Sequence, residues 1–241
     1  MELKISASWI KMEPNHDTPL CIYCEERLYR LKSDTVKCSR CKKKYSLRKL
    51  HTDLRVIDAF CDGASALAAA HSLGLNYVTV KKRFDRFRSL VALHLEERYL
   101  GRNAPVDEYE EYIYLEAAKR HDQRHIFDAH NFITFDYGGW VYTLMMPSLH
   151  RYKQQFLDDD LCDVYYREFT KFLRLNRIAK LQRHNNRITE FWGFFESFIL
   201  PYRGVESDHF VYYLKEAEFK FNYPDPERKE VLRRLWLETK R

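Results

Sequence analysis

The chain has 241 residues, more than one typical domain, so we expect two or three units. Hydrophobic residues make up 45% of it and charged residues 32%, which is ordinary for a globular protein in water. No stretch approaches the roughly 18 unbroken apolar residues of a membrane span, and the N-terminus lacks the basic-then-apolar layout of a signal peptide. Composition therefore argues against a membrane protein and predicts a cytoplasmic location.

The net charge of +6 is concentrated at the N-terminal end. Residues 1–50 contain twice as many lysines and arginines as acidic residues, whereas the two kinds nearly balance over the rest of the chain. Such an excess of positive charge would hold a polyanion. On charge alone, a solvated basic surface is an equally good interpretation.

Four of the six cysteines form two close pairs in this basic segment. They stand as Cys21-x-x-Cys24 and Cys38-x-x-Cys41, with thirteen residues between the pairs. Two residues between the ligands of a pair allow a tight turn to direct both thiolates at one ion, which is typical of a four-cysteine zinc ribbon. The alternatives are a chance pairing or two disulfides, and disulfides fit poorly with a cytosolic chain. We predict a structural zinc ion in a zinc ribbon of residues 1–50.

A basic strip follows the second cysteine pair and runs to Lys49. Because the zinc site would hold it in place, we expect it to present several cations at once to a phosphate backbone. The residues expected to contact DNA are Lys42, Lys43, Lys44 and Arg48.

Residues 54–88 have the order and length of a helix-turn-helix, and we assign them to a three-helical domain of residues 51–101. Gly74 can adopt the left-handed conformation that ends one helix, and Asn76 is a good N-cap for the next. The apolar wedge between the two helices is predicted to consist of Ala68, Leu75, Val80 and Phe84.

The start of the second helix is the predicted DNA-reading surface. In a DNA reader, residues near the start of that helix face base edges, while its cations meet phosphates. The alternative is an ordinary helical hairpin with solvated lysines, but the neighbouring zinc ribbon and basic strip favour DNA binding. The residues concerned are Tyr77, Thr79, Lys81, Lys82 and Arg83.

Strand patterns followed by helical patterns predict a mixed α/β domain over residues 102–241. Gly101 to Pro105 is typical of a linker. An acidic and aromatic stretch predicts a strand at 107–115, and a hairpin with its turn at 136–139 is predicted between Asn131 and Pro147. Helical patterns follow at 164–181, 188–199 and 209–222.

One run of basic residues lies in and just after the first of these helical patterns. Its members recur every three or four residues with no acid between them, so they would share a broad face of a helix. A solvated face and a second contact with DNA are both consistent with this pattern. The run consists of Arg174, Arg177, Lys180, Arg183 and Arg187.

A zinc ribbon, a helix-turn-helix and a mixed domain, in that order, resemble small bacterial insertion-sequence transposases with an RNase H-like DDE domain. Residues 131–147 are similar to the family's central hairpin, including Val141-Tyr142-Thr143 and the closing proline. Residues 184–192 and 213–222 are similar to its C-terminal signature. The resemblance covers nearly the whole chain and implies an α+β multidomain protein with an RNase H-like domain.

This resemblance implies that the protein cuts and joins DNA ends. Three acidic residues would hold two divalent cations, Mg²⁺ or Mn²⁺, on either side of the scissile phosphate. The implied partners are double-stranded terminal inverted repeats and further copies of the chain, as a homodimer or higher oligomer on DNA.

The acidic triad of the family is only partly matched. The third acid falls at Thr189, and the adjacent Glu190 is rotated by about 100° around a helix. Asp163 is the best candidate for the second acid, and the alternatives are Asp158, Asp159 and Asp160. The candidates for the first acid are Asp107, Glu110 and Glu111.

Three functions remain open at this point. The nearly complete architecture favours an active transposase. The departure at Thr189 favours a catalytically inactive, transposase-derived DNA-binding regulator. A more distant alternative is an unrelated zinc-ribbon transcription factor with a ligand-sensing C-terminal domain.

Overall fold

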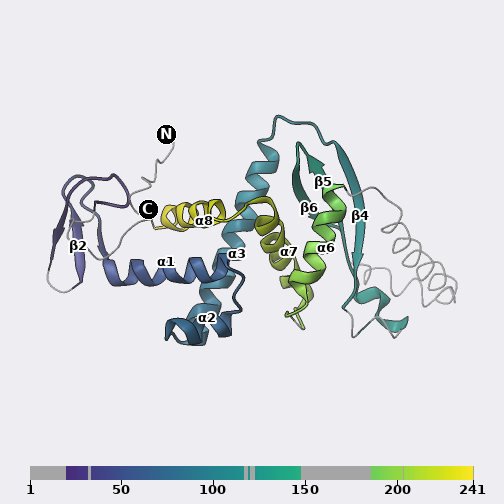
Figure 1. Cartoon of the computed structure of the whole chain (residues 1–241), viewed down its shortest axis with the longest axis horizontal. Helices are drawn as coiled ribbons and strands as arrows, with labels where there is room; N and C mark the ends of the chain where they lie inside the picture. The colour runs from purple at the N-terminus through teal and green to yellow at the C-terminus, as the bar shows by residue number, and fades with distance from the viewer. Residues whose placement is uncertain are drawn as a thin grey trace. The chain divides into compact units, whose positions relative to one another are not determined.

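The structure is a computed structural model that describes residues 20–31, 34–116, 119, 123–147, 186–202 and 204–240 (Figure 1). Over these residues the chain forms six α-helices, a 3-10 helix and two three-stranded antiparallel sheets. The expected α+β class is therefore confirmed. None of the helices in the described ranges is long and apolar enough to cross a membrane.

The chain divides into two compact units. The first unit is formed by Met1–Leu90 together with Pro224–Arg241, and the second by Val91–Tyr223. The two ends of the chain thus belong to the same unit. The finer division into 1–50, 51–101 and 102–241 stays a prediction.

A small three-stranded sheet begins the first unit. It consists of β1 (Leu28–Arg30), β2 (Thr35–Cys38) and β3 (Lys44–Ser46), paired in chain order. Because neighbouring side chains on a strand point to opposite faces, Leu28, Val36 and Cys38 turn inward and are buried. Their neighbours face outward.

Three helices follow the sheet: α1 (Leu47–Cys61), α2 (Ala66–Leu73) and α3 (Tyr77–Leu100). Ser65 caps the start of α2 by accepting the Ala68 backbone N–H. Gly74 ends α2 with φ 63° and ψ 36°, and the Asn76 side chain accepts the Val78 backbone N–H at 2.9 Å at the start of α3. Both predicted helix ends are confirmed, since each depends on one residue and its immediate neighbours.

The interior of these helices is built around three phenylalanines, Phe60, Phe84 and Phe87. Of the predicted wedge, Val80 and Phe84 are buried and Leu75 is half-buried, but Ala68 is exposed. The prediction for Ala68 is wrong. The next two residues, Ala69 and Ala70, are the buried ones, because each step along a helix turns the side chain by about 100°.

A fourth helix, α8 (Glu227–Glu238), returns to this unit and packs against α1. The Trp236 ring meets Phe87 edge-on at 5.1 Å between centroids, and the Trp236 indole N–H donates to the Asp53 carboxylate at 3.2 Å. Arg233 pairs with Asp58 at 2.6 Å. The helical core of the first unit therefore includes residues from the C-terminal end of the chain.

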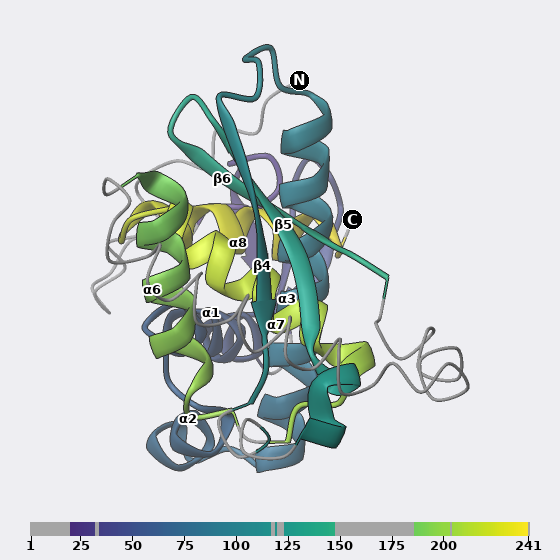
Figure 2. The ribbon, with the colours of Figure 1, turned by 90° about the vertical axis from the view of Figure 1, so that its right-hand side faces the viewer.

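The second unit is organised on a sheet of β4 (Glu108–Tyr114), β5 (His130–Tyr137) and β6 (Trp140–Met145), in that order (Figure 2). Gly138 and Gly139, with φ of 60° and 80°, form the turn between β5 and β6. A two-residue turn with positive φ matches the twist of a hairpin. The predicted strand and hairpin are confirmed, while the helical pattern at 164–181 lies outside the described residues.

Helices pack on both faces of this sheet. On one face, Phe132 and Val141 share a core with α6 (Arg187–Ile199) and α7 (Ser207–Asn222). On the other face, Tyr99 near the end of α3 stacks on Tyr142 at 3.9 Å between ring centroids and contacts Phe135. A short 3-10 helix, η3 (Gln123–Asp128), precedes β5.

Candidate metal centre and nucleic-acid interface

The four cysteines of the two pairs converge on one point. Their sulfur atoms all lie within 4.8 Å of one another, with Cys21 Sγ 3.6 Å from Cys41 Sγ and Cys24 Sγ 3.4 Å from Cys38 Sγ. A disulfide needs about 2.05 Å, and these cysteines are free. Zn–S bonds of about 2.3 Å in a tetrahedron give sulfur separations of about 3.8 Å. The arrangement therefore fits a metal such as zinc.

The backbone around the two pairs is built as two equivalent turns. The residue after each pair, Glu25 and Lys42, has a positive φ of 58° and 59°. Backbone N–H groups point at sulfur in the second turn, where Arg40 and Cys41 donate to Cys38 Sγ at 3.3 and 3.4 Å. Burial opposes ionisation of Cys38, but these N–H groups stabilise the thiolate and lower its pKa to about 6. In the first turn, burial instead raises the pKa of Cys21 to about 12 and raises that of Cys24, so only Cys38 is shifted toward the thiolate that binds metal.

The hydrophobic core around this centre is small. Besides Cys21 and Cys38, its buried members are Leu28 and Val36, with Tyr45 among the half-buried side chains at its edge. So few apolar side chains cannot offset the entropy of ordering three strands. A structural metal would supply the missing folding free energy.

The start of α3 projects polar and aromatic side chains into solvent. Tyr77 is 45% exposed, and Thr79, Lys81 and Lys82 are exposed as well. Val80, between them, is fully buried and anchors the helix. The exposure of these four side chains agrees with the sequence, and their contact with DNA stays a prediction.

Arg83 has a different environment from the other residues predicted on this helix. Its guanidinium pairs with Asp53 of α1 at 2.8 Å, and its side chain is only 20% exposed. Because the pair joins two helices inside the unit, it indicates a structural role for Arg83, whose contact with DNA was predicted from the sequence.

The predicted basic strip lies along β3 and the first turn of α1. Lys42, Lys44 and Arg48 are exposed. Lys43 instead lies over the Tyr23 ring, 4.1 Å from its centroid. Three of the four predicted cations are thus presented to solvent.

The candidate acids for the first catalytic position lie in three different environments. Asp107 accepts the Gly138 backbone N–H at 2.7 Å and so holds the turn of the hairpin. Glu110 is half-buried and pairs in register with Thr134, on the sheet face that α6 and α7 cover. Glu111, next along the strand, is exposed on the opposite face. Glu110 is the one that shares a face with α6.

The residues predicted for the third catalytic position, Thr189 and Glu190, lie in the first turn of α6. The Thr189 hydroxyl and the Asn186 side chain cap each other's backbone N–H groups, so Thr189 has a structural role. The Glu190 carboxylate is 51% exposed and lies 3.5 Å from Arg187. Apart from the four cysteines, no three potential metal ligands converge among the described residues. Asp158, Asp159, Asp160, Asp163, Arg174, Arg177, Lys180 and Arg183 lie outside them.

The signature-like segment 213–222 covers the free edge of β6, a role that the sequence analysis missed. Asn222 of α7 accepts the Val141 backbone N–H at 2.9 Å and donates to the Val141 carbonyl at 2.6 Å. Glu218 accepts the Thr143 N–H at 2.9 Å, and Lys215 donates to the Thr143 carbonyl at 2.6 Å. In the sequence, this role is indicated by the polar residues Lys215, Glu218 and Asn222, which recur at i, i+3 and i+7 of an otherwise buried helix.

Two of these buried side chains carry opposite charges and also interact with each other. Lys215 and Glu218 form an ion pair at 2.7 Å. Burial raises the pKa of Glu218 and lowers that of Lys215, and the attraction within the pair opposes both shifts. Side chains thus satisfy the backbone groups that an edge strand leaves open.

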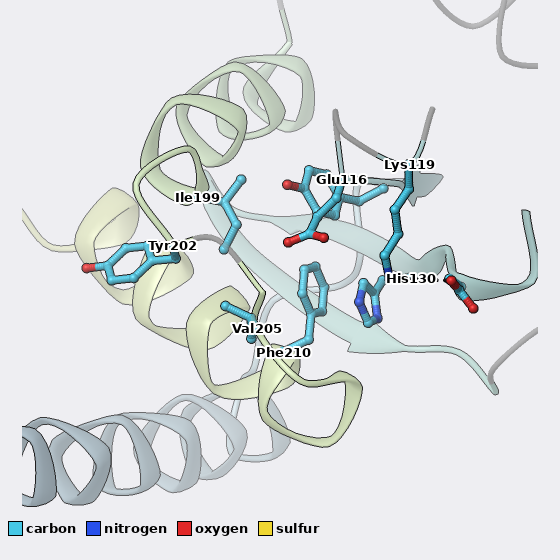
Figure 3. Close-up of a pocket in the computed structure, with 9 residues that line it drawn as sticks. Glu116, Lys119, His130, Ile199, Tyr202, Val205 and Phe210 are labelled. Atoms are coloured by element: carbon cyan, nitrogen blue, oxygen red, sulfur yellow. Dashed lines mark ion pairs between the residues drawn. The ribbon is translucent and has the colours of Figure 1, made fainter. Parts of the chain in front are cut away.

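A pocket of about 370 Å³, including its open mouth, lies between the ends of β4 and β5 and the segment joining α6 to α7 (Figure 3). His130 stacks on Phe210 at 3.8 Å, and burial lowers the pKa of this imidazole to about 4. The two acids of the pocket are already bonded, since Glu116 accepts the Gly204 N–H at 2.9 Å and Asp128 pairs with Lys119 at 3.4 Å. These bonds point to a structural role for the pocket.

Comparison with known proteins adds no assignment: no family model, no curated protein and no solved structure matches the chain.

Proposed function

We propose that the protein binds double-stranded DNA through its first unit and reads base sequence with the first two turns of α3. The observation that carries this proposal is the exposure of Tyr77 and Thr79 at the start of a helix that Val80 and Phe84 anchor. A helix held by its buried side can enter the major groove with its N-terminal residues at the base edges.

The connection from α2 to α3 supports a helix-turn-helix. α2 is an eight-residue helix, its left-handed end at Gly74 turns the chain, and Asn76 starts the longer α3. A short helix, a tight turn containing glycine and a longer second helix are the parts of this motif. Lys81 and Lys82, beyond the base-reading residues, would meet phosphates.

The exposed cations of the metal-binding segment support a wider contact. Lys42, Lys44 and Arg48 belong to the same unit as α3 and lie beside the four-cysteine centre. Zinc in this centre would have a structural role, because four thiolates leave no position for a substrate. The same metal would hold the basic strip in a defined shape.

We further propose that the chain descends from insertion-sequence transposases and acts on terminal inverted repeats as a dimer or higher oligomer. The hairpin at 130–145 and the α7 segment that covers its edge support this descent, since both regions of resemblance fit together in one unit. The first candidate function within this descent is DNA binding without chemistry. The capping role of Thr189, where the family has an acid, favours it.

The second candidate is strand cleavage and joining with Mg²⁺ or Mn²⁺. The position of Glu110 favours it, because this half-buried carboxylate lies on the sheet face that α6 covers. A complete site would also need Asp163 and Glu190. Binding and cleavage of labelled terminal-repeat duplexes by the full chain test both candidates, and a chain that binds no duplex would refute both.

A further inference from the structure

The sheet of β1, β2 and β3 has one face turned away from the four cysteines, called the outer face here. A row of three side chains crosses this face, one from each strand. Tyr29 of β1 pairs in register with Lys37 of β2, which pairs with Lys44 of β3. Directly opposed residues in an antiparallel sheet share a face and lie about 5 Å apart. Leu28, one residue from Tyr29, lies on the other face, toward the cysteines. The row therefore faces away from the metal centre.

We propose that this outer face is a second nucleic-acid site, which stacks an unpaired base on Tyr29 and holds the adjoining phosphates with Lys37 and Lys44. The inference rests on the proposed DNA binding of the chain, but it concerns a different surface from α3, one that shares only Lys44 with the proposed basic strip, and a different form of the ligand.

The exposure of Tyr29 is the first observation behind it. The side chain is 54% exposed, and within the described residues it has no ring or hydrogen-bond contact. The other tyrosines of this segment do have contacts, since Tyr23 packs edge-on against Tyr45 at 5.8 Å. An uncovered aromatic ring on a rigid sheet is the platform on which proteins stack single-stranded bases.

The charge of the face is the second observation. Arg27 precedes β1 and Leu31 follows it on the same side as Tyr29, so the outer positions hold three cations together with Leu31, Thr35 and Ser46, and no acid. Among the described residues, neither Lys37 nor Lys44 forms an ion pair. Of the neighbouring acids, Glu26 pairs with Arg40 at 3.6 Å, while the Asp34 carboxylate accepts the Arg48 backbone N–H at 2.7 Å and the Ser46 hydroxyl at 3.0 Å. The face is complementary to a phosphate backbone.

An exposed aromatic ring beside two lysines favours binding of an unpaired strand over binding of an intact duplex. In a duplex the base faces are covered by their neighbours, so a ring that protrudes from a sheet has nothing to stack on unless the base pair opens. An unpaired strand offers its base faces and its phosphates together, and each matches one part of the row. For a protein that acts at DNA ends, the ligand is the frayed or single-stranded end.

The test uses the full chain and three labelled DNAs of one sequence: a single strand, its blunt duplex, and the duplex with a single-stranded overhang. We expect Tyr29→Ala to weaken binding of the single strand and of the overhang on the order of tenfold, with blunt-duplex binding unchanged. Tyr29→Phe should bind like the wild type, because stacking needs the ring and not the hydroxyl. Lys37→Ala should weaken single-strand binding and flatten its salt dependence.

Tyr109→Ala, which removes an exposed tyrosine from β4 in the other unit, is the matched control and should leave all three affinities unchanged. Metal content measured on every variant checks that the ribbon is intact. The inference is overturned if the wild type binds the duplex but neither unpaired form, or if Tyr29→Ala binds all three DNAs like the wild type. It is also overturned if Tyr29→Ala changes only the oligomeric state, since the face would then bind another copy of the chain. In these cases duplex binding through α3 stands; a chain that binds no DNA refutes both proposals.

Discussion

Arg83 of α3 donates to Asp53 of α1 across 2.8 Å, and the aspartate side chain is only 5% exposed. Lys240 pairs with the same carboxylate, and the Trp236 indole N–H donates to it from α8. One buried acid thus joins α1, α3 and the C-terminal end of the chain.

Replacing this acid should destabilise the first unit. Asp53→Ala leaves a buried guanidinium and an indole N–H without their acceptor, so we expect a loss of about 3–5 kcal/mol in the free energy of unfolding. Urea unfolding followed by tryptophan fluorescence measures this loss of stability, since the Trp236 indole contacts Asp53. The control is Glu26→Ala, which removes an exposed partner of Arg40 and should cost under about 1 kcal/mol. Equal effects from the two variants would contradict the role of Asp53.

The metal centre should hold about one zinc ion per chain. Cys38→Ser should lose the metal and the order of β1 to β3, because the small core of the ribbon cannot replace the binding free energy. Cys61→Ser is the matched control, since this buried cysteine lies in α1 and outside the metal group. Elemental analysis and amide hydrogen exchange provide the readouts. A folded, metal-free ribbon would argue against a structural ion.

Substitutions on the proposed recognition surface of α3 should separate base reading from phosphate binding. Thr79→Ala or Tyr77→Ala should cost about 1–3 kcal/mol at the base that is read and relax the preference there. Lys82→Ala should weaken binding to all duplexes and reduce the salt slope by about one. Arg55→Ala, an exposed cation on α1, serves as control. Selection from random duplexes, followed by titrations at several salt concentrations, measures both effects; an unchanged selected sequence for Thr79→Ala and Tyr77→Ala would place base reading elsewhere.

Stability should depend on pH through His130. Burial lowers the pKa of this imidazole from 6.5 to about 4, so between these values the unfolded chain binds more protons than the native chain. The contribution of His130 to stability is therefore present above pH 6.5 and is lost as the pH falls toward 4. His130→Phe keeps a ring against Phe210 and should reduce this pH dependence, whereas replacement of the exposed His209 should not. Identical pH profiles for wild type and His130→Phe would disprove the assignment.

If the chain cleaves DNA, the cleavage should require acidic side chains that DNA binding does not require. Asp163→Ala and Glu190→Ala should each abolish Mn²⁺-dependent cutting of terminal-repeat duplexes and leave their binding intact, because the proposed binding surface belongs to the first unit. Glu238→Ala, an exposed acid at the end of α8, is a control that should retain activity. A wild-type chain that binds tightly and never cuts with either metal would leave the DNA-binding regulator as the function.

Features that depend on neighbouring residues could be predicted from the sequence. The cysteine spacing, the helix end at Gly74 and the hairpin turn at Gly138 each require only a few consecutive residues with a restricted backbone. Features that depend on distant contacts could not. Nothing near Arg83 indicates that Asp53 would neutralise it, and nothing near Trp236 indicates that it would pack on Phe87.

The error at Ala68 has a related cause. In the run Ala68-Ala69-Ala70 every residue is small and apolar, so periodicity alone does not identify the buried side. The pairing of the Thr189 side chain with Asn186 was likewise not evident, although an N-cap and its partner three residues later are a known pattern. Similarly, alternation along β1 and β2 places Tyr29 and Lys37 outside, but only the observed register sets them side by side.

The return of α8 to the first unit has a consequence for synthesis of the chain. Trp236 and Lys240 complete the buried site around Asp53, so the helices that present α3 acquire their last contacts only when translation has passed the entire second unit. A ribosome that stops early, through a nonsense codon or a frameshift, releases a chain whose α3 lacks this support. Under the proposed DNA binding, truncated products would compete poorly for the same sites with a chain that retains α8.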